Sequence, residues 1–402
     1  MTNTKYGLPE KVKFCTKCVI SNQRPNSVVE FKNKKNDKKP TIDFNENGVC
    51  AACQYKEIKD RNIDWEKRER ELHDLCDKYR SHDGSYDCLV PGSGGKDSRY
   101  VSHLLKYKYN MNPLTATWAP HDYTDIGFRN MISWFQDGFS NYLITPNRKL
   151  HRYLTREAFL NLGHPFQPFI LGQKTMAPRL AKQLGIKLVF WGENTAEYGT
   201  NIEENEVPTM VPTYFTLSKE QIYDDYLVAG KSINNILEET NFNISDFNPY
   251  LPLEPSDVED VSFQFFGYYV NWDPQEIYYF VEEKTGFEPN PVRTEGSYSR
   301  YSSIDDKIDT LHYYTTLLKF GLGRASYDAA QEIRYNKITR DEGVKLVQKY
   351  DCERPVKFLP DLLNYLSLTE EEFDIACDKL RPSHLWRKNN GEWELINKIW
   401  ES

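Results

Sequence analysis

The sequence lacks a long apolar run and lacks a surplus of basic residues. Its 402 residues carry 51 Lys and Arg against 59 Asp and Glu, a formal net charge of −8. No apolar stretch approaches the ~20 residues of a membrane-spanning helix, and the start, MTNTKYGLPEK, has no apolar signal core. We therefore expect a cytoplasmic protein without a membrane partner. The acidic balance also argues against a nucleic-acid partner, and the one dense basic run, residues 32–39, is interpreted as a solvated loop.

The sequence has only eight cysteines, and four of them form two closely spaced pairs. Without an export signal the thiols are expected to stay reduced, where cysteines bind metal more often than they form disulfides. Cys15 and Cys18 form one pair, and Cys50 and Cys53 form the other. Two tight turns bearing paired thiolates match the ligand set of tetrahedral Zn²⁺. We expect a zinc-ribbon-like module at residues 1–60 with structural Zn²⁺, and an iron–sulfur cluster remains the alternative.

The rest of the chain divides into a linker helix at residues 61–85, an α/β domain at 86–300 and a helical region at 301–402. Strand and helix patterns alternate between residues 86 and 192, which is typical of a parallel sheet. The patterns predict strands at residues 86–90, 113–118, 141–145, 187–191 and 262–270. They predict helices at 97–109, 125–137, 150–162, 170–184, after Asp273-Pro274, and at 304–320, 325–335, 340–350 and, as two short helices, within 359–380.

A glycine-rich segment, PGSGGKDS, follows the first predicted strand and opens the first helix of the sheet. Glycines let backbone N–H groups approach an anion, and the helix N-terminus adds partial positive charge. A Walker A loop needs Ser or Thr after its lysine, but Asp97 follows Lys96 here. The GxGxxG dinucleotide pattern fails at the same position. The segment therefore predicts a phosphate site of another kind.

SGGKDS resembles the loop of the ATP pyrophosphatases, whose fold is the adenine-nucleotide α-hydrolase type and which cleave ATP between its α and β phosphates. The resemblance implies ATP as a substrate and a loop that surrounds the pyrophosphate. Asp97 is then the candidate ligand of Mg²⁺. The nucleotide-binding candidates in and beside the loop are Gly92, Ser93, Gly94, Gly95, Lys96, Asp97 and Ser98.

Further candidates lie where the other predicted strands end, because ligands of open parallel sheets gather at the carboxyl ends of the strands. Trp118 ends one strand and, like Gly192 at the end of another, is a candidate for contact with the nucleotide. His121 and Asp122 follow Trp118 and are candidates for contacts with substrate. Another strand ends in WGEN and supplies Gly192, with Glu193 and Asn194 as catalytic candidates beside Lys96 and Asp97. Gly172 and Gln173, in a predicted helix, are candidates for contacts with the nucleotide.

Five parts of the chain form one pattern: the four-cysteine module, PGSGGKDS, NPLTATWAPHDYTDIG, WGEN and a long stretch between residues 268 and 340. The long stretch contains NPVRTEGSYSRYSSIDDKID and HYYTTLLKFGLGRASYDAAQEIR. Together these parts resemble the N-acetyl sugar amidotransferases of bacterial surface-polysaccharide and flagellar-glycan pathways, and the resemblance covers most of the chain. The basic residues of the long stretch are candidates for binding a sugar carboxylate or nucleotide phosphates: Arg293, Arg300, Lys307 and Arg324.

The resemblance implies conversion of an acetamido group of a nucleotide-activated sugar to an acetamidino group. The amide oxygen would be adenylylated, AMP and pyrophosphate would be released, and ammonia would come from a separate glutaminase of the histidine-biosynthesis type. No cysteine of this sequence has the context of a glutaminase nucleophile. A tRNA-modifying ATP pyrophosphatase of the thiolation or lysidine type is the alternative, since it too combines such loops with cysteine modules.

Overall fold

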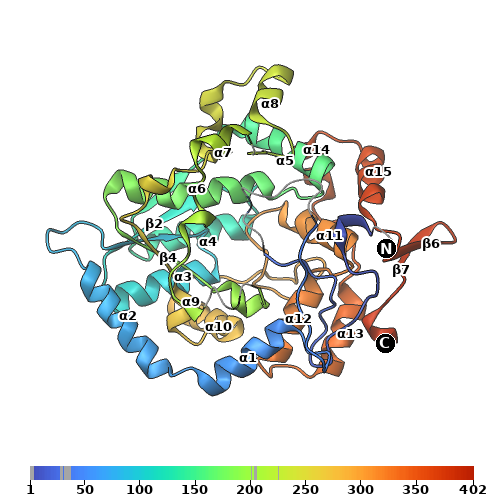
Figure 1. Ribbon diagram of the computed structural model, residues 1–402, viewed down its shortest axis with the longest axis horizontal. Helices are drawn as coiled ribbons and strands as arrows, with labels where there is room; N and C mark the ends of the chain where they lie inside the picture. Colours follow the sequence, from blue (N-terminus) through green and yellow to red (C-terminus); the bar gives the residue numbers. More distant parts are fainter. Residues whose placement is uncertain (1–3, 28–29, 31–37, 201, 203–205, 225) are drawn as a thin grey trace.

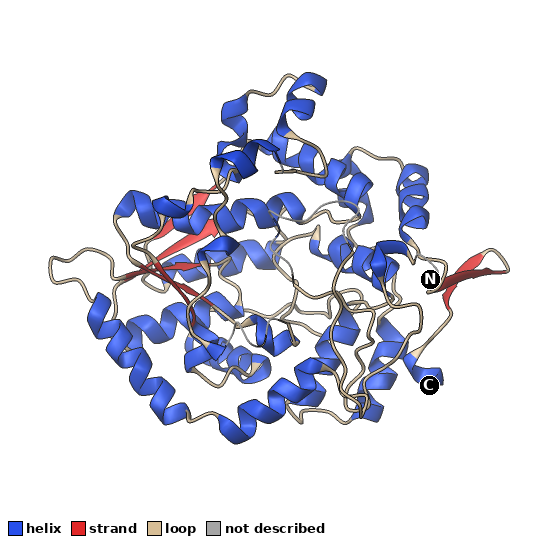
Figure 2. Ribbon diagram, in the orientation of Figure 1, coloured by secondary structure: helices blue, strands red, loops and turns tan. Residues whose placement is uncertain are grey.

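Five parallel strands form the centre of the protein in a computed structural model that describes residues 4–27, 30, 38–200, 202, 206–224 and 226–402. Most of the basic run predicted as a loop lies outside these residues. Figure 2 shows the sheet in red among helices. The strands are β1 (Cys88–Pro91), β2 (Pro113–Trp118), β3 (Asn141–Ile144), β4 (Leu188–Trp191) and β5 (Ser262–Phe265). Their order is β3-β2-β1-β4-β5, so the direction of winding reverses between β1 and β4.

Helices cover both faces of the sheet. Successive residues of a strand point to opposite faces, so each face packs in a core of its own. Leu89 of β1 packs in a core with α5 (Arg148–Leu162) and α6 (Gln167–Leu184). Its neighbours Cys88 and Val90 pack on the other side with α2 (Trp65–Tyr79) and α3 (Lys96–His103). The helix predicted as a linker therefore covers one face of the sheet.

The other predicted helices are present in the predicted order with small shifts at their ends, whereas the helices at residues 51–62, 219–224, 233–239 and 266–269 were not predicted. Around the sheet the remaining helices are α1 (Ala51–Asn62), the π-helical continuation of α3 called η3 (Leu104–Lys108), α4 (Asp125–Gln136), α7 (Lys219–Asp224), α8 (Ile233–Glu239), α9 (Phe266–Tyr269) and α10 (Pro274–Lys284). Beyond them lie α11 (Asp309–Phe320), α12 (Arg324–Arg334), α13 (Arg340–Tyr350), α14 (Leu359–Leu366) and α15 (Glu370–Leu380). The predicted fold class, a parallel α/β sheet with a four-cysteine module and a helical C-terminal region, is confirmed.

Two predicted elements have the wrong extent. The strand predicted at 262–270 ends at Phe265, and the short helix α9 follows. Phe266 and Tyr269 of α9 are buried against α2 and α3, so their apolar character reflects a helix–helix contact rather than a strand. The helix predicted at 304–320 begins only at Asp309, because the preceding residues form a loop that bonds to the sheet domain. In that loop the Asp305 carbonyl accepts from Thr124 N.

The C-terminal region contains one hairpin that the sequence patterns did not predict. β6 (Trp386–Asn389) pairs antiparallel with β7 (Glu392–Leu395) around Asn390 and Gly391, which both have positive φ. Such a pair of residues is typical of a tight hairpin turn. The two short helices predicted within 359–380 are confirmed, and Thr369 caps the second of them through the N–H of Glu372.

The N-terminal module packs on the C-terminal helices rather than standing apart. Figure 1 shows the dark blue N-terminal trace beside α11, α12 and α13. Cys15 and Cys50 share a buried cluster with Ala329 of α12 and Val347 of α13. Segments from the two ends of the chain therefore form one core. None of the helices in the described ranges is long and apolar enough to cross a membrane.

Candidate active site

The glycine-rich loop follows β1 and leads into α3 at the point where the strand order reverses. A crevice at the carboxyl ends of the strands is the usual ligand site of such a sheet. The backbone N–H of Gly92 still bonds to Ala116 O of β2, and Gly95 is the N-cap of α3. The loop therefore presents the N-terminus of α3 at this crevice, where an anion is favoured.

Two glycines of the loop are required by its geometry. A Cβ on Gly92 would lie 2.1 Å from Cβ of Ser98, so no larger residue fits. Gly94 has φ +84°, a conformation that side chains other than glycine rarely adopt. Hydroxyls complete the turn, since Ser98 Oγ accepts from Gly94 N and Ser93 Oγ accepts from Gly95 N.

A buried arginine that the sequence analysis missed fixes the loop from behind. Arg99 is 1% exposed, and its Nε donates to Gly94 O at 2.9 Å. Its two other nitrogens reach Asp137 at 2.5 Å and Asn130 O at 2.6 Å on and beside α4. Arg99 thus holds the loop against α4 at a fixed distance. The sequence offers one cue for it, the position of Arg99 in the first turn of the helix that follows the loop.

The loop faces a cavity of about 550 Å³, which we call the first cavity. This volume lies within the range of small-molecule sites. One wall consists of the loop and the end of β4. The opposite wall comes from the C-terminal region and includes Ser303, Asp305, Tyr313, Arg324, Asp328, Gln331 and Tyr335. Two regions far apart in the sequence therefore enclose the same space.

Three carboxylates surround the loop in this cavity. Asp305 Oδ2 accepts a 2.5 Å hydrogen bond from Ser93 Oγ, and burial raises the pKa of Asp305 to about 6. Burial also raises the pKa of Glu193, and the Asp97 carboxylate adds to this shift. The Asp97 carboxylate raises the pKa of both Glu193 and Asp305, so a cation in the cavity would relieve repulsion among the three groups. Carboxylate oxygens are the ligands that Mg²⁺ prefers, which makes Asp97, Glu193 and Asp305 the candidates to bind it together with a nucleotide.

Cations in the first cavity balance part of this charge. Lys96 Nζ lies 2.5 Å from Asp97 Oδ1. Lys174 Nζ lies 4.5 Å from the centre of the Trp191 ring, and burial lowers the pKa of Lys174 to about 8. An incoming phosphate would favour the charged form of this lysine. Lys174 was missed, although it directly follows the predicted Gln173.

Most of the loop candidates line the first cavity, as do several candidates from other elements: Gly92, Ser93, Gly95, Lys96, Asp97, Ser98, Gln173, Gly192, Glu193 and Arg324. Gly94 does not line it, because the position of its missing side chain faces Met131 and Trp134 of α4. The structure thus brings together residues that the chain spreads over more than half its length.

Three nucleotide or catalytic candidates are turned away from the cavity. A Cβ on Gly172 would lie 2.1 Å from the Trp118 ring, so these two residues pack against each other. Trp118 is 3% exposed within the core of the sheet. Asn194 is buried, and its side chain caps the turn η4 (Thr195–Tyr198) by accepting from Ala196 N. These residues shape the walls of the site from behind.

His121 and Asp122, which were expected to contact substrate, lie instead in contacts within the protein. His121 is fully buried, its Nδ1 lies 2.7 Å from Asp306 Oδ2, and its ring stacks on that of His151. Asp122 forms an ion pair with Lys307 at 3.0 Å, and Lys307 also pairs with Asp361. This network fastens the end of β2 to the loop before α11.

Arg293 and Arg300 also lie outside the residues that line the first cavity. Arg293 forms a two-pronged ion pair with Glu353, with both N–O distances at 2.7 Å. Arg300 Nε donates to Asn290 O, and its side chain is exposed. Of the four basic candidates, only Arg324 lies in the cavity. It stacks over the Tyr313 ring at 4.4 Å and lies 3.1 Å from Asp328.

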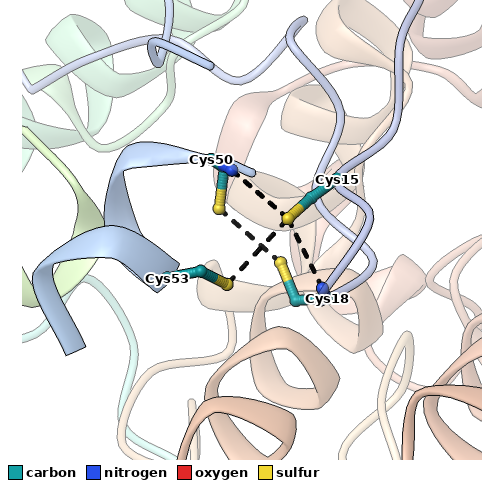
Figure 3. A group of neighbouring side chains, drawn as sticks. All are labelled: Cys15, Cys18, Cys50 and Cys53. Carbon is teal, nitrogen blue, oxygen red and sulfur yellow. Dashed lines mark hydrogen bonds between the residues drawn. The ribbon is translucent and has the colours of Figure 1, made fainter. Parts of the chain in front are cut away.

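The four paired cysteines converge on one point, as Figure 3 shows. Cys15 and Cys18 come from a loop, while Cys50 and Cys53 come from the start of α1. All four Sγ atoms lie within 4.8 Å of one another and are buried. The Cys15–Cys53 and Cys18–Cys50 sulfur distances are 3.9 and 3.7 Å. The cluster can therefore hold a metal ion or an iron–sulfur cluster.

The C-terminal part of the chain is similar to a described family. Residues 295–400 match the family described as "LPS biosynthesis protein WbpG-like, C-terminal domain". An uncharacterized protein of Methanocaldococcus jannaschii, MJ1599, is 32% identical over 76 residues, which are 19% of this chain and 27% of that protein. The match thus spans about a quarter of the length of this relative.

Three solved structures show remote similarity to this chain. The match to an NH3-dependent NAD synthetase from Campylobacter jejuni covers 34% of this chain and 59% of the synthetase chain, with 15% identity and a TM-score of 0.26. An NMN synthetase from Francisella tularensis covers 69% and 94%, with 11% identity and a TM-score of 0.26. The U34-tRNA thiolase NcsA from Methanococcus maripaludis covers 81% and 92%, with 11% identity and a TM-score of 0.27.

Proposed function

We propose that this protein is an ATP-dependent N-acetyl sugar amidotransferase of surface-glycan biosynthesis. One observation carries the proposal: the segment that matches the WbpG-like C-terminal domain lines the same cavity as the SGGKDS loop. The loop fits a pyrophosphate group, and the matched segment supplies the opposite wall. A site built from these two parts is suited to bringing a glycan precursor to the α-phosphate of ATP.

The chemistry follows from the weakness of an amide as an electrophile. The acetamido oxygen of the sugar attacks the α-phosphorus, the α–β bond breaks, and pyrophosphate leaves on the loop. The nitrogen loses its proton, which gives an O-adenylyl imidate. Ammonia then attacks the imidate carbon, the C–O bond to AMP breaks, and the product is an acetamidinium group. The protein forms no covalent bond in this sequence.

The protein's part is to position the two substrates and to balance charge. Backbone N–H groups of the loop and Lys96 would bind the leaving pyrophosphate. Asp97, Glu193 and Asp305 would hold Mg²⁺, which when bound neutralises phosphate charge. Lys174, which lines the cavity beside Trp191 at the end of β4, would also approach the phosphates. Arg324 would orient the sugar at the opposite wall.

We also propose that the cysteine cluster holds structural Zn²⁺. Four thiolates at about 2.3 Å from one tetrahedral ion lie about 3.8 Å apart. The distances of 3.9 and 3.7 Å agree with that spacing. An iron–sulfur cluster places several atoms between its thiolates and needs them farther apart. Metal analysis distinguishes the two, since zinc without iron or sulfide is expected.

Two partners belong to the proposal. The acceptor is a nucleotide-activated, N-acetylated sugar, and ammonia comes from a separate glutaminase with its channel subunit. Incubation with ATP, Mg²⁺, ammonium and candidate nucleotide sugars tests the reaction by mass spectrometry. Replacement of O by NH lowers the neutral mass by about one dalton, and AMP should accumulate. Formation of ADP would overturn the mechanism, and tight, salt-sensitive tRNA binding would favour the tRNA-modifying alternative.

A further inference from the structure

A second cavity of about 430 Å³ adjoins the first and has no role in the chemistry described above. It lies between the N-terminal module, the end of α5 and the helices α11 and α12. The two cavities share part of their lining, namely Ser27, Tyr198, Tyr313, Arg324, Asp328 and Gln331. A ligand in the second cavity would therefore reach the wall of the first.

Positive charge dominates the second cavity. The basic residues that line it are Arg24, Lys39, Lys319, Arg324 and Arg334, whereas its carboxylates are Glu30 and Asp328. Asp328 already lies 3.1 Å from Arg324. The surplus of guanidinium and ammonium groups in a confined space favours an anionic ligand. Arginine in particular offers paired N–H donors that match phosphate oxygens.

Two of these arginines are buried without a carboxylate partner among the described residues. Arg334 is 9% exposed; its Nη2 donates to Glu197 O at 3.4 Å, and its Nη1 has no hydrogen-bond partner in the same ranges. Arg24 is 5% exposed and donates to the Tyr198 carbonyl. Thiolates of the cysteine cluster supply part of the opposing charge, since those of Cys18, Cys53 and Cys50 raise the pKa of Arg334 and that of Cys50 acts on Arg24. Nη1 of Arg334 is still left without an acceptor among the described residues, and a buried donor without an acceptor is costly. Here both arginines reach one cavity.

Aromatic rings and a buried lysine complete the lining. The Arg24 guanidinium lies 5.6 Å from the centre of the Tyr198 ring and 5.2 Å from that of Tyr327. Lys319 Nζ donates to Leu162 O, and burial lowers the pKa of Lys319 to about 7. A nearby phosphate would restore the charged form of this amine. Rings beside cations are also suited to the flat faces of a base or a sugar.

We propose that this second cavity binds the phosphate-bearing half of the acceptor, a nucleoside mono- or diphosphate, through Arg24, Lys319 and Arg334. This inference rests on the proposed function. The nucleotide of the sugar would occupy the second cavity, and its acetamido group would enter the first cavity past Arg324 and Tyr313. ATP would occupy the first cavity, so the two nucleotides would bind without competing.

Calorimetry with UDP, CMP, uridine and MgATP as separate probes tests this assignment. UDP or CMP should bind the wild type and uridine should not, because uridine lacks phosphate. Arg24→Gln and Lys319→Met should each weaken binding of UDP or CMP at least tenfold and change MgATP affinity less than twofold. The matched control is Arg129→Gln, because Arg129 is exposed and pairs with Glu288 far from this lining. It should leave all affinities unchanged.

Three outcomes would overturn the assignment: equal affinity of Arg24→Gln and wild type for the phosphate probes, displacement of UDP or CMP by MgATP, or no binding of either probe. Arg334→Gln adds a third variant, and retained MgATP affinity identifies variants that are correctly folded. The proposed function is tested separately by amidine formation. If amidination occurs and does not depend on Arg24 or Lys319, the second site is refuted and the reaction is not. If UDP or CMP binding depends on these residues but no sugar is amidinated, the reaction is refuted and the second site is not.

Discussion

The two cavities are neighbours, yet their linings carry opposite charge. Among the described residues, the first cavity is lined by the carboxylates Asp97, Glu193, Asp273, Asp305, Asp328 and Glu332 against Lys96, Lys174, Arg324 and Lys337. The second is lined by arginines and lysines, and the acids that line it within the described ranges are Glu30 and Asp328. An acidic cavity accepts a triphosphate only together with a divalent cation, whereas a basic one binds phosphate directly. In our proposal, this difference in charge directs two nucleotides to separate cavities of one protein.

The largest effect should come from Asp97→Asn. Asp97 stands in the first turn of α3 beside the loop, and its loss removes a proposed ligand of Mg²⁺. We expect AMP formation to fall by about 10²-fold or more, because preorganised charge in such sites contributes effects of that size. Binding of UDP or CMP in the second cavity should not change. AMP release is measured with saturating sugar and ammonium.

Asp74→Asn is the control for this variant, because Asp74 is exposed on α2 and lies outside both cavities. Wild-type rates for Asp97→Asn at every Mg²⁺ concentration would show that the first cavity does not depend on a cation held by this residue. The proposed difference, that the first cavity needs a divalent cation and the second does not, would then be refuted.

The next largest effect should come from loss of the metal, which should disturb the second cavity more than the first. Ile20 and Arg24 of the N-terminal module line that cavity, while among its described residues only Ser27 lines the first. Cys53→Ser should abolish stoichiometric zinc and weaken UDP or CMP binding more than MgATP binding. Elemental analysis and calorimetry measure both. Cys352→Ser is the control, since Cys352 is exposed and lies outside the cluster. Equal losses of both affinities would argue that the module supports the whole fold.

Arg324→Lys tests the role of the wall that the two cavities share. Arg324 stacks over Tyr313 and contacts Asp328, and a lysine keeps the charge but loses the planar fork. We expect a loss of about tenfold in the rate of amidination with smaller changes in the affinity of either nucleotide probe. Arg300→Lys, on an exposed side chain, should have no effect. A loss confined to one probe would place Arg324 in that cavity only.

The smallest effect is a change in how stability depends on pH. Burial raises the pKa of Asp305 to about 6 and that of Asp309 to about 7, so the folded protein holds protons that the unfolded chain releases above about pH 4. The free energy of unfolding should therefore fall as pH rises through this window. Asp305→Asn should raise the melting temperature by a few degrees at pH 8 and by almost nothing at pH 4. An equal shift at both values would refute the linkage.

Local patterns made much of the fold predictable. The strand at Pro113–Trp118 and the helix at Arg340–Tyr350 have the predicted bounds, because each is a short apolar or amphipathic segment between clear breakers. The cysteine cluster was predictable because metal ligands come in pairs with fixed spacing. The hairpin at Asn390 and Gly391 was equally local, and its turn signal was overlooked.

Contacts between residues far apart in the sequence could not be predicted. Ser93 and Asp305 are 212 positions apart in the sequence but hydrogen-bonded in the site, and no periodicity reveals such a pair. For the same reason His121, plausible from its place after a strand, proved to be buried against Asp306. The basic residues between positions 293 and 324 looked alike in sequence, yet Glu353 neutralises Arg293 while Arg324 faces the cavity.

The central claim is that the acetamido oxygen of the sugar attacks the α-phosphorus of ATP. A nucleotide sugar labelled with ¹⁸O in its acetamido carbonyl tests this directly when turned over with ATP, Mg²⁺ and ammonium. AMP that carries the label, heavier by about two daltons, together with an unlabelled amidine, is the predicted result. Unlabelled AMP, or release of ADP, would contradict the account.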